Sequence, residues 1–137
     1  LLFRGDGALR AKIGVAPVAA RPLAASWDPA RGVLTLVTFT LPEGARDYVN
    51  STWVVPQDEP FRGDAVNSYN DGPPAPGAAP FGPFYELESS SPAAALAPGQ
   101  SLTHTHRTLH LEGPRAELDR VARTVLGLSL DAIEGGL

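Results

Sequence analysis

Proline and glycine interrupt this chain so often that only short regular segments fit between them. The 137 residues include 14 of each. The densest interruption, residues 71–80, holds four prolines and two glycines and cannot form regular structure. Short segments separated by turns favour an antiparallel sandwich or barrel, so the chain is predicted to be mainly β. Trp27 and Trp53 are expected to lie in its core rather than to act as stacking platforms.

Three segments have the composition of strands. Residues 32–40 are rich in β-branched and aromatic side chains and follow a turn signal at Asp28, which predicts the second arm of a hairpin. Residues 48–55 are expected to form another strand, ended by Pro56, whose nitrogen cannot donate to a ladder. A short third strand is expected at residues 64–69.

One segment has the period of a helix. The apolar side chains of residues 115–126 fall on one stripe, with Pro114 near its start and Gly127 at its end. The predicted fold class is therefore an antiparallel β-sandwich with one peripheral C-terminal helix. Residues 134–137 are expected to form a polar, glycine-rich tail after Ile133.

Composition argues against several classes of partner. The formal net charge is −4, and the ten arginines and one lysine form no basic stripe, so neither nucleic acid nor an anionic membrane is expected as a partner. A neutral or weakly charged ligand is expected instead. The absence of cysteine excludes disulfides and thiolate metal sites. No apolar run approaches the roughly 20 residues of a membrane span, so membrane insertion is not expected.

The first residues do not have the form of a protein start. Residues 1–6 begin without methionine and lack the charged and apolar regions of a signal peptide. Residues 1–137 are therefore interpreted as a single segment, the C-terminal part of a larger domain, and the missing N-terminal half is an expected partner. Half of a sandwich expressed alone is expected to expose an apolar edge and to associate.

Charged groups alternate along two expected strands near the C-terminus. Successive side chains of a strand point to opposite faces, so Glu86 and Glu88 share one face of the strand that follows the proline-rich loop. By the same rule, His104, His106 and His110 share one face of the next expected strand. If these two strands pair or face each other, carboxylates meet imidazoles.

The order of motifs in this region resembles that of a known family. Aldose 1-epimerases, of the galactose-mutarotase-like superfamily, carry Gly-x-x-x-Glu, then a loop with proline, then Leu-x-Pro-Gly-Glu and a strand that begins with His-Thr. The matching residues here are Gly82 to Glu86, Pro92, Leu96 to Gln100, and His104 with Thr105. With the segments at residues 12–14, 48–51 and 67–74, the chain as a whole resembles an uncharacterised bacterial family with that superfamily fold.

The resemblance implies a supersandwich of two sheets that binds a sugar or glycan in a cleft on one concave sheet, without a cofactor. By position it implies that Glu86 is the catalytic base, which removes the proton of the anomeric hydroxyl while an acid protonates the ring oxygen. The residues expected to bind the sugar are Asn67, Tyr69, Asn70, Asp71, Glu88, His104, His106 and Arg107.

The sequence departs from the family pattern at three points. The family's acid histidine lies upstream of the glutamate, whereas no histidine precedes His104 here. Gln100 stands where the family has glutamate, and Glu88 stands where it has glutamine. Two functions therefore remain open: epimerase-type acid/base catalysis on a bound sugar, and a non-catalytic carbohydrate-binding or structural accessory module.

The same residues have structural roles open to them. The two glutamates could form a solvated strand face paired with Arg107. The three histidines, on a strand expected at residues 101–112, could bind zinc. Hydrogen bonds to sugar hydroxyls or a place at a polar sheet edge are favoured, so no metal is predicted. Residues 67–71 suit the hydroxyls and apolar face of a sugar, and equally suit an Asn-Asp-Gly turn.

Overall fold

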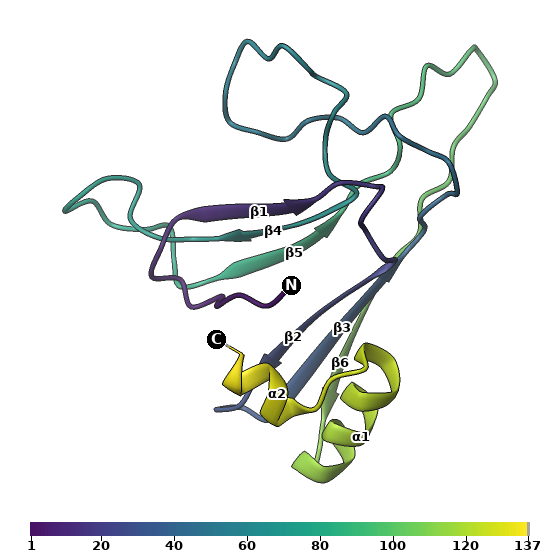
Figure 1. Cartoon of the computed structure of the whole chain (residues 1–137). Helices are drawn as coiled ribbons and strands as arrows, with labels where there is room; N and C mark the ends of the chain where they lie inside the picture. Colours follow the sequence, from purple (N-terminus) through teal and green to yellow (C-terminus); the bar gives the residue numbers. More distant parts are fainter. Residues whose placement is uncertain (137) are drawn as a thin grey trace.

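The computed structural model describes residues 1–136 and is mainly β, as predicted (Figure 1). Within that range, six strands form two three-stranded antiparallel sheets, and two short helices follow them. The strands are β1 Ala11–Val15, β2 Leu23–Asp28, β3 Val33–Phe39, β4 Val66–Asn70, β5 Tyr85–Ser89 and β6 His106–Glu112. The helices are α1 Arg115–Leu126 and α2 Leu130–Gly135.

The two sheets are built from strands that are not consecutive in the sequence. The first sheet has the order β1-β4-β5, and the second has the order β2-β3-β6. Figure 1 shows the sheets diverging from the end at which β1 leads into β2, with both helices beside the second sheet. The chain therefore crosses between the sheets several times, which joins them at that end.

The central strand β3 contributes to two apolar clusters, one on each of its faces. Leu34 and Leu36 are buried against the helices. Val37 and Phe39 point to the opposite face and are buried with Val66 of the first sheet. Burial of both faces explains why this segment is nearly continuous in apolar residues.

The hairpin predicted around residues 32–40 is confirmed. β2 pairs antiparallel with β3. The carboxylate of Asp28 accepts hydrogen bonds from the N–H groups of Ala30 and Arg31, at 3.0 and 3.1 Å, and so orders the turn between them. Gly32 completes the turn with a φ of +66°, which glycine adopts without a steric penalty.

The strand predicted at residues 48–55 is wrong. Tyr48 alone forms a bridge, with Arg62, and the remainder of the segment lies outside any strand. The segment folds back on its own continuation instead, since the Asn50 N–H donates to the carbonyl of Pro60 at 2.8 Å. These local hydrogen bonds replace the ladder that a neighbouring strand would have supplied.

The two tryptophans lie in different surroundings. Trp27 packs against the apolar cluster beneath the helices, as predicted, and its indole N–H donates to Glu134 at 2.6 Å. Trp53 is 57% exposed, so the core position predicted for it is wrong. The cause is the missing strand, because a loop does not carry its side chains into the packed face of a sheet.

Strand limits elsewhere differ from the predictions by a few residues. β4 confirms the short strand expected near residues 64–69, and residues 71–80 form the expected loop. The strand expected at residues 101–112 begins only at His106. β1 is not predicted, because its short sequence carries no clear alternation, and its pairing with β4 is a long-range contact.

The helix predicted at residues 115–126 is confirmed, but a second helix corrects the prediction of a single one. α1 ends at Gly127, which has a φ of +72°. α2 has six residues, too few for a helical period to show, and it includes part of the segment expected to be a polar tail. Its one sequence signal is Ser129, whose hydroxyl accepts from the Ala132 N–H at 3.0 Å.

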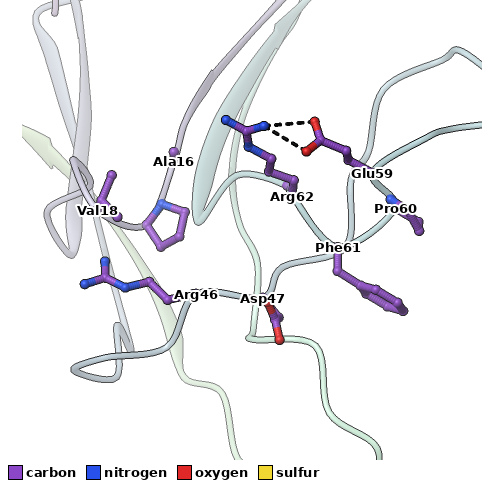
Figure 2. A pocket seen from close by; sticks show the side chains of 10 residues that line it. Ala16, Val18, Arg46, Asp47, Glu59, Pro60, Phe61 and Arg62 are labelled. Atoms are coloured by element: carbon purple, nitrogen blue, oxygen red, sulfur yellow. Dashed lines mark hydrogen bonds and ion pairs between the residues drawn. The ribbon is translucent and has the colours of Figure 1, made fainter.

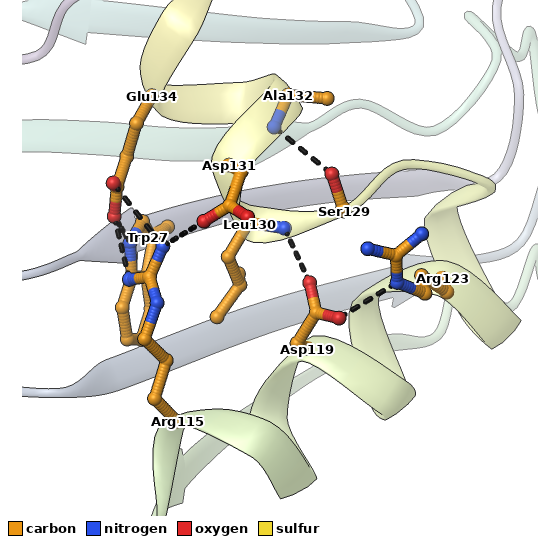
Figure 3. A network of polar contacts seen from close by, with 9 residues as sticks. All are labelled: Trp27, Arg115, Asp119, Arg123, Ser129, Leu130, Asp131, Ala132 and Glu134. Atoms are coloured by element: carbon orange, nitrogen blue, oxygen red, sulfur yellow. Dashed lines mark hydrogen bonds and ion pairs between the residues drawn. The ribbon is translucent and has the colours of Figure 1, made fainter.

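Polar contacts hold α2 against its neighbours (Figure 3). Arg115, at the start of α1, donates to Asp131 at 2.6 Å and to Glu134 at 2.8 Å. Asp119 accepts from the Leu130 N–H at 2.8 Å, and the Leu130 side chain is fully buried. A helix this short is marginal in isolation, so these tertiary contacts are what stabilise it.

Candidate functional site

The first sheet gathers four of the predicted site residues on one face. In its register, Lys12, Tyr69 and Glu86 form one row across β1, β4 and β5. Gly14, Asn67 and Glu88 form the next row. Alternation along each strand places the side chains of both rows on the same face. We call this surface the Tyr69 face, and its side chains are Lys12, Asn67, Tyr69, Glu86 and Glu88.

The lysine of the Tyr69 face neutralises one of its two glutamates. Lys12 Nζ lies 3.6 Å from a carboxylate oxygen of Glu88. Among residues 1–136, Glu86 takes part in no ion pair, and its side chain is exposed. The alternative in which these glutamates pair with Arg107 is therefore wrong, because Glu88 pairs with a lysine of β1, and Glu86 remains open to a ligand.

A third carboxylate fills the space that Gly14 leaves. A Cβ at this position would collide with the carboxylate of Asp64. Burial raises the pKa of Asp64, and the nearby charge of Lys12 opposes that rise. Asn67, in the same row, is 5% exposed, and its Oδ1 has no hydrogen-bond partner in the described part of the chain. This end of the face is thus crowded and polar.

An arginine and aromatic rings border the Tyr69 face. The guanidinium carbon of Arg10 lies 4.7 Å from the centre of the exposed Trp53 ring, within cation–π range. The Tyr69 and Phe81 rings lie 5.7 and 5.9 Å from the same carbon. Trp53 also meets Tyr69 edge to face, with 5.8 Å between ring centroids. The predicted site residues do not include Arg10, Lys12 or Trp53. Arg10 and Lys12 are two residues apart, and this spacing could have indicated that the two cations share one face.

Asp71 supports Tyr69 from a buried position and does not lie on the open surface. The Tyr69 hydroxyl donates to Asp71 Oδ1 at 2.6 Å, and the Gly82 N–H donates to Oδ2 at 2.9 Å. The side chain of Asp71 is fully buried. The hydrogen bond from Tyr69 holds the pKa of Asp71 below its ordinary value, and the same bond raises the pKa of Tyr69. Asp71 is thus a positioning residue that closes the proline-rich loop.

Replacing Tyr69 with phenylalanine is expected to destabilise the fold most at neutral pH. A carboxyl with a depressed folded-state pKa adds stability above its unfolded pKa and loses it as pH falls through the folded-state value. The loss in free energy of unfolding that Tyr69→Phe causes should therefore become smaller below about pH 4. Urea unfolding at neutral and acidic pH measures it. The control Tyr85→Phe removes a hydroxyl bonded to Ser26, so its deficit should not vary with pH. Equal pH dependence of both variants would contradict this role.

Asn70 lies on the opposite face of the first sheet. Its Oδ1 accepts from the Gly7 N–H at 3.0 Å, and its Nδ2 donates to the Leu9 carbonyl at 2.8 Å. Only 6% of the residue is exposed. Asn70 therefore anchors the segment before β1, and so positions Arg10, rather than meeting a ligand on the Tyr69 face.

The carboxylates and the imidazoles do not meet. β5 pairs with β4 and β6 pairs with β3, so the two strands belong to different sheets. The Ser89 hydroxyl, on the face of β5 away from Glu86, lies 2.9 Å from His104 Nε2 and 2.8 Å from His106 Nδ1. Both predicted histidines are therefore behind the sheet that carries the glutamates.

The second sheet separates the remaining predicted groups. His110 Nδ1 lies 3.0 Å from the Thr35 hydroxyl, on the side that faces the first sheet. Arg107 pairs with Thr38 in the register and shares the face of Leu36, which carries the helices. Arg107 is thus two layers away from the Tyr69 face and is not placed to contact a ligand there.

Two cavities in the described chain lie away from the Tyr69 face. The larger, about 560 Å³, lies between residues 16–18 and the loop of residues 46–63 (Figure 2). Arg62 Nη1 donates there to both carboxylate oxygens of Glu59, at 2.8 and 3.0 Å. The smaller, about 220 Å³, lies between the sheets beside Tyr85. Neither is lined by a residue predicted to bind sugar.

The arrangement of the histidines differs from a zinc site. His104 and His106 share one serine hydroxyl. Within residues 1–136, no group of three histidine, aspartate or glutamate side chains is arranged to hold a metal ion.

Among residues 1–136, no helix has the length and apolar character needed to cross a membrane.

A protein-family model covers the whole sequence. It is described as a family of unknown function (DUF6786), and it matches residues 1–137. No curated protein and no solved structure gives a significant match. The function must therefore be argued from the residues themselves.

Proposed function

The chain belongs to this family of unknown function (DUF6786), and we propose that it binds a carbohydrate on the Tyr69 face. The observation that carries the proposal is the exposed Trp53 ring, which contacts Tyr69 beside two glutamates on one sheet face. A sugar presents C–H groups to an aromatic ring and hydroxyls to the carboxylates and amides around it. The aromatic and polar groups needed for both kinds of contact are next to each other here.

We also propose that the two sheets are parts of one sandwich of the galactose-mutarotase-like type. The order of the motifs from Gly82 to Thr105 supports this assignment. So does the apolar contact between the sheets, in which Val37 and Phe39 pack against Val66. In such a sandwich the Tyr69 face is the outer surface of one sheet and is accessible to a ligand.

Glu86 is the candidate base if the bound sugar reacts at its anomeric carbon. Its exposed carboxylate has no cation partner in the described chain, so it is available to take the proton of the anomeric hydroxyl. Opening of the ring also requires a proton at the ring oxygen. Lys12 is in the same row as Glu86, on the far side of Tyr69, and is the candidate donor of that proton.

A non-catalytic carbohydrate-binding module is the second candidate function. One specific observation favours it: both histidines predicted to bind sugar lie behind the first sheet, so no imidazole of the described chain faces Glu86. The ammonium group of Lys12 is also paired with Glu88, on the strand that carries Glu86. The two candidates share the binding step and differ only in whether the anomers exchange.

Sugar binding is expected to change the fluorescence of Trp53. In a Trp27→Phe background Trp53 is the single tryptophan, so titration with a panel of aldoses reports on the Tyr69 face. A saturable change is expected there, and none in Trp53→Phe protein, where only Trp27 remains. By calorimetry, Trp53→Ala should weaken binding about three- to tenfold, because it removes the stacking ring. Binding that is equally strong in Trp53→Ala would contradict the proposal.

A further inference from the structure

Arg10 is held in place by aromatic rings and pairs with no carboxylate of residues 1–136. The nearest ring, Trp53, is 4.7 Å from the guanidinium carbon. All ion pairs formed among residues 1–136 involve other cations. A guanidinium stacked on rings keeps its planar set of N–H donors available at the edge. That edge is suited to a carboxylate, which accepts two parallel hydrogen bonds from arginine.

The neighbouring charges of the described chain leave Arg10 as an unpaired cation beside the Tyr69 face. Lys12 is occupied by Glu88. Asp71 is buried and accepts from Tyr69 and from a backbone N–H. Glu86 is unpaired but belongs to β5, which is separated from β1 by β4, a distance of about 10 Å across the sheet. Among residues 1–136, the surface therefore presents a cation without an ion-pair partner at one side and a carboxylate without one at the other.

We propose that the carbohydrate bound by the Tyr69 face carries a carboxylate, as a uronic acid does, and that Arg10 binds this carboxylate. The inference rests on the proposed function and adds the chemical class of the ligand. In a hexuronate the carboxylate is attached to the carbon next to the ring oxygen. A carboxylate bound by Arg10 therefore places the sugar ring over Trp53 and Tyr69. The sugar hydroxyls on the side of the ring away from the carboxylate then point toward Glu86.

The overall charge of the chain does not oppose an acidic ligand. The net charge of −4 underlies the expectation of a neutral or weakly charged ligand. At physiological salt, exposed charges more than about 8 Å apart are largely screened. A bound carboxylate consequently responds to the arginine in contact with it far more than to distant surface carboxylates. A sugar with a single carboxylate is still a weakly charged ligand, as the net charge leads us to expect.

Calorimetric titration of the wild-type protein with glucuronate and glucose, and with galacturonate and galactose, tests the inference. Each acidic sugar is expected to bind about tenfold or more tightly than its neutral parent, as a charge-assisted contact predicts. Arg10→Gln should lose this preference while still binding the neutral sugars. Arg10→Lys keeps the positive charge but loses the planar set of N–H donors, so it should retain part of the preference for acidic sugars. Arg120→Gln, on the exposed side of α1, is the control and should retain all of it.

The outcomes separate this inference from the proposed function. Equal affinities for acidic and neutral sugars, both weakened by Trp53→Ala, would overturn the carboxylate and keep carbohydrate binding. Tighter binding of a phosphorylated sugar than of a uronate would also overturn the carboxylate. Failure of every sugar to bind would overturn the proposed function and this inference together. The comparison of acidic with neutral sugars uses wild-type protein, so it decides the matter even if Arg10→Gln folds poorly.

Discussion

The Glu86→Gln variant is expected to lose the catalysed exchange between the α and β anomers of its sugar. An amide keeps the shape of the side chain but cannot take up a proton at neutral pH, so the rate should fall by a factor of about 10²–10⁴. The fold should not change, because Glu86 is exposed and makes no ion pair in the described chain. Magnetisation-transfer NMR between the two anomers measures the exchange directly.

A matched variant tests whether the effect belongs to this carboxylate. Glu117→Gln makes the same substitution on an exposed position of α1, and it should exchange anomers at the wild-type rate. Sugar binding, followed by Trp53 fluorescence, should survive in Glu86→Gln. If the wild-type protein binds sugar without accelerating the exchange of anomers, Glu86 has no catalytic role. The function is then that of a non-catalytic binding module.

Leu34→Ala is expected to lower the free energy of unfolding by about 3–5 kcal/mol. Leu34 is fully buried between the second sheet and the two helices, so its truncation leaves a cavity that its neighbours fill only in part. A loss of this size is a large fraction of the stability of an ordinary domain. Urea unfolding followed by circular dichroism gives the change in the free energy of unfolding. The slope of this free energy against urea concentration should be the same in the wild type and the variant.

The control for this prediction is a leucine outside the core. Leu96→Ala removes the same atoms from a loop side chain that is 50% exposed, and the change should stay below about 0.5 kcal/mol. If Leu34→Ala cost less than about 1 kcal/mol, the helices would not pack on the second sheet as described, because only a solvated leucine is truncated at so small a cost.

The sequence predicts best those elements whose local signals are complete. α1 has an apolar stripe, a proline before it and a glycine after it, and its limits agree with the prediction. β3 is a continuous run of β-branched and apolar residues after a turn. α2 offers only its capping serine, and β1 depends on its pairing with β4, which is a contact between distant parts of the chain.

The candidate site is predictable only along single strands. Alternation groups Glu86 with Glu88 correctly, because the period of two is a local property. Whether these glutamates face the histidines depends on which sheet each strand joins, and that is set by tertiary packing. Trp53 reaches the site from a loop outside the strands, so no periodicity indicates the direction of its side chain.

A single hydroxyl between two imidazoles couples their tautomers. Ser89 has one proton to donate and lies within hydrogen-bonding distance of both rings. If it donates to His104, then neutral His106 carries its proton on Nδ1 and accepts from Thr108, 3.2 Å away. If it donates to His106, then His104 donates to the serine and His106 donates to Thr108. The two rings must therefore exchange tautomers together, so a proton rearrangement at His104, just before β6, passes through a hydroxyl of the first sheet and returns to β6 at Thr108.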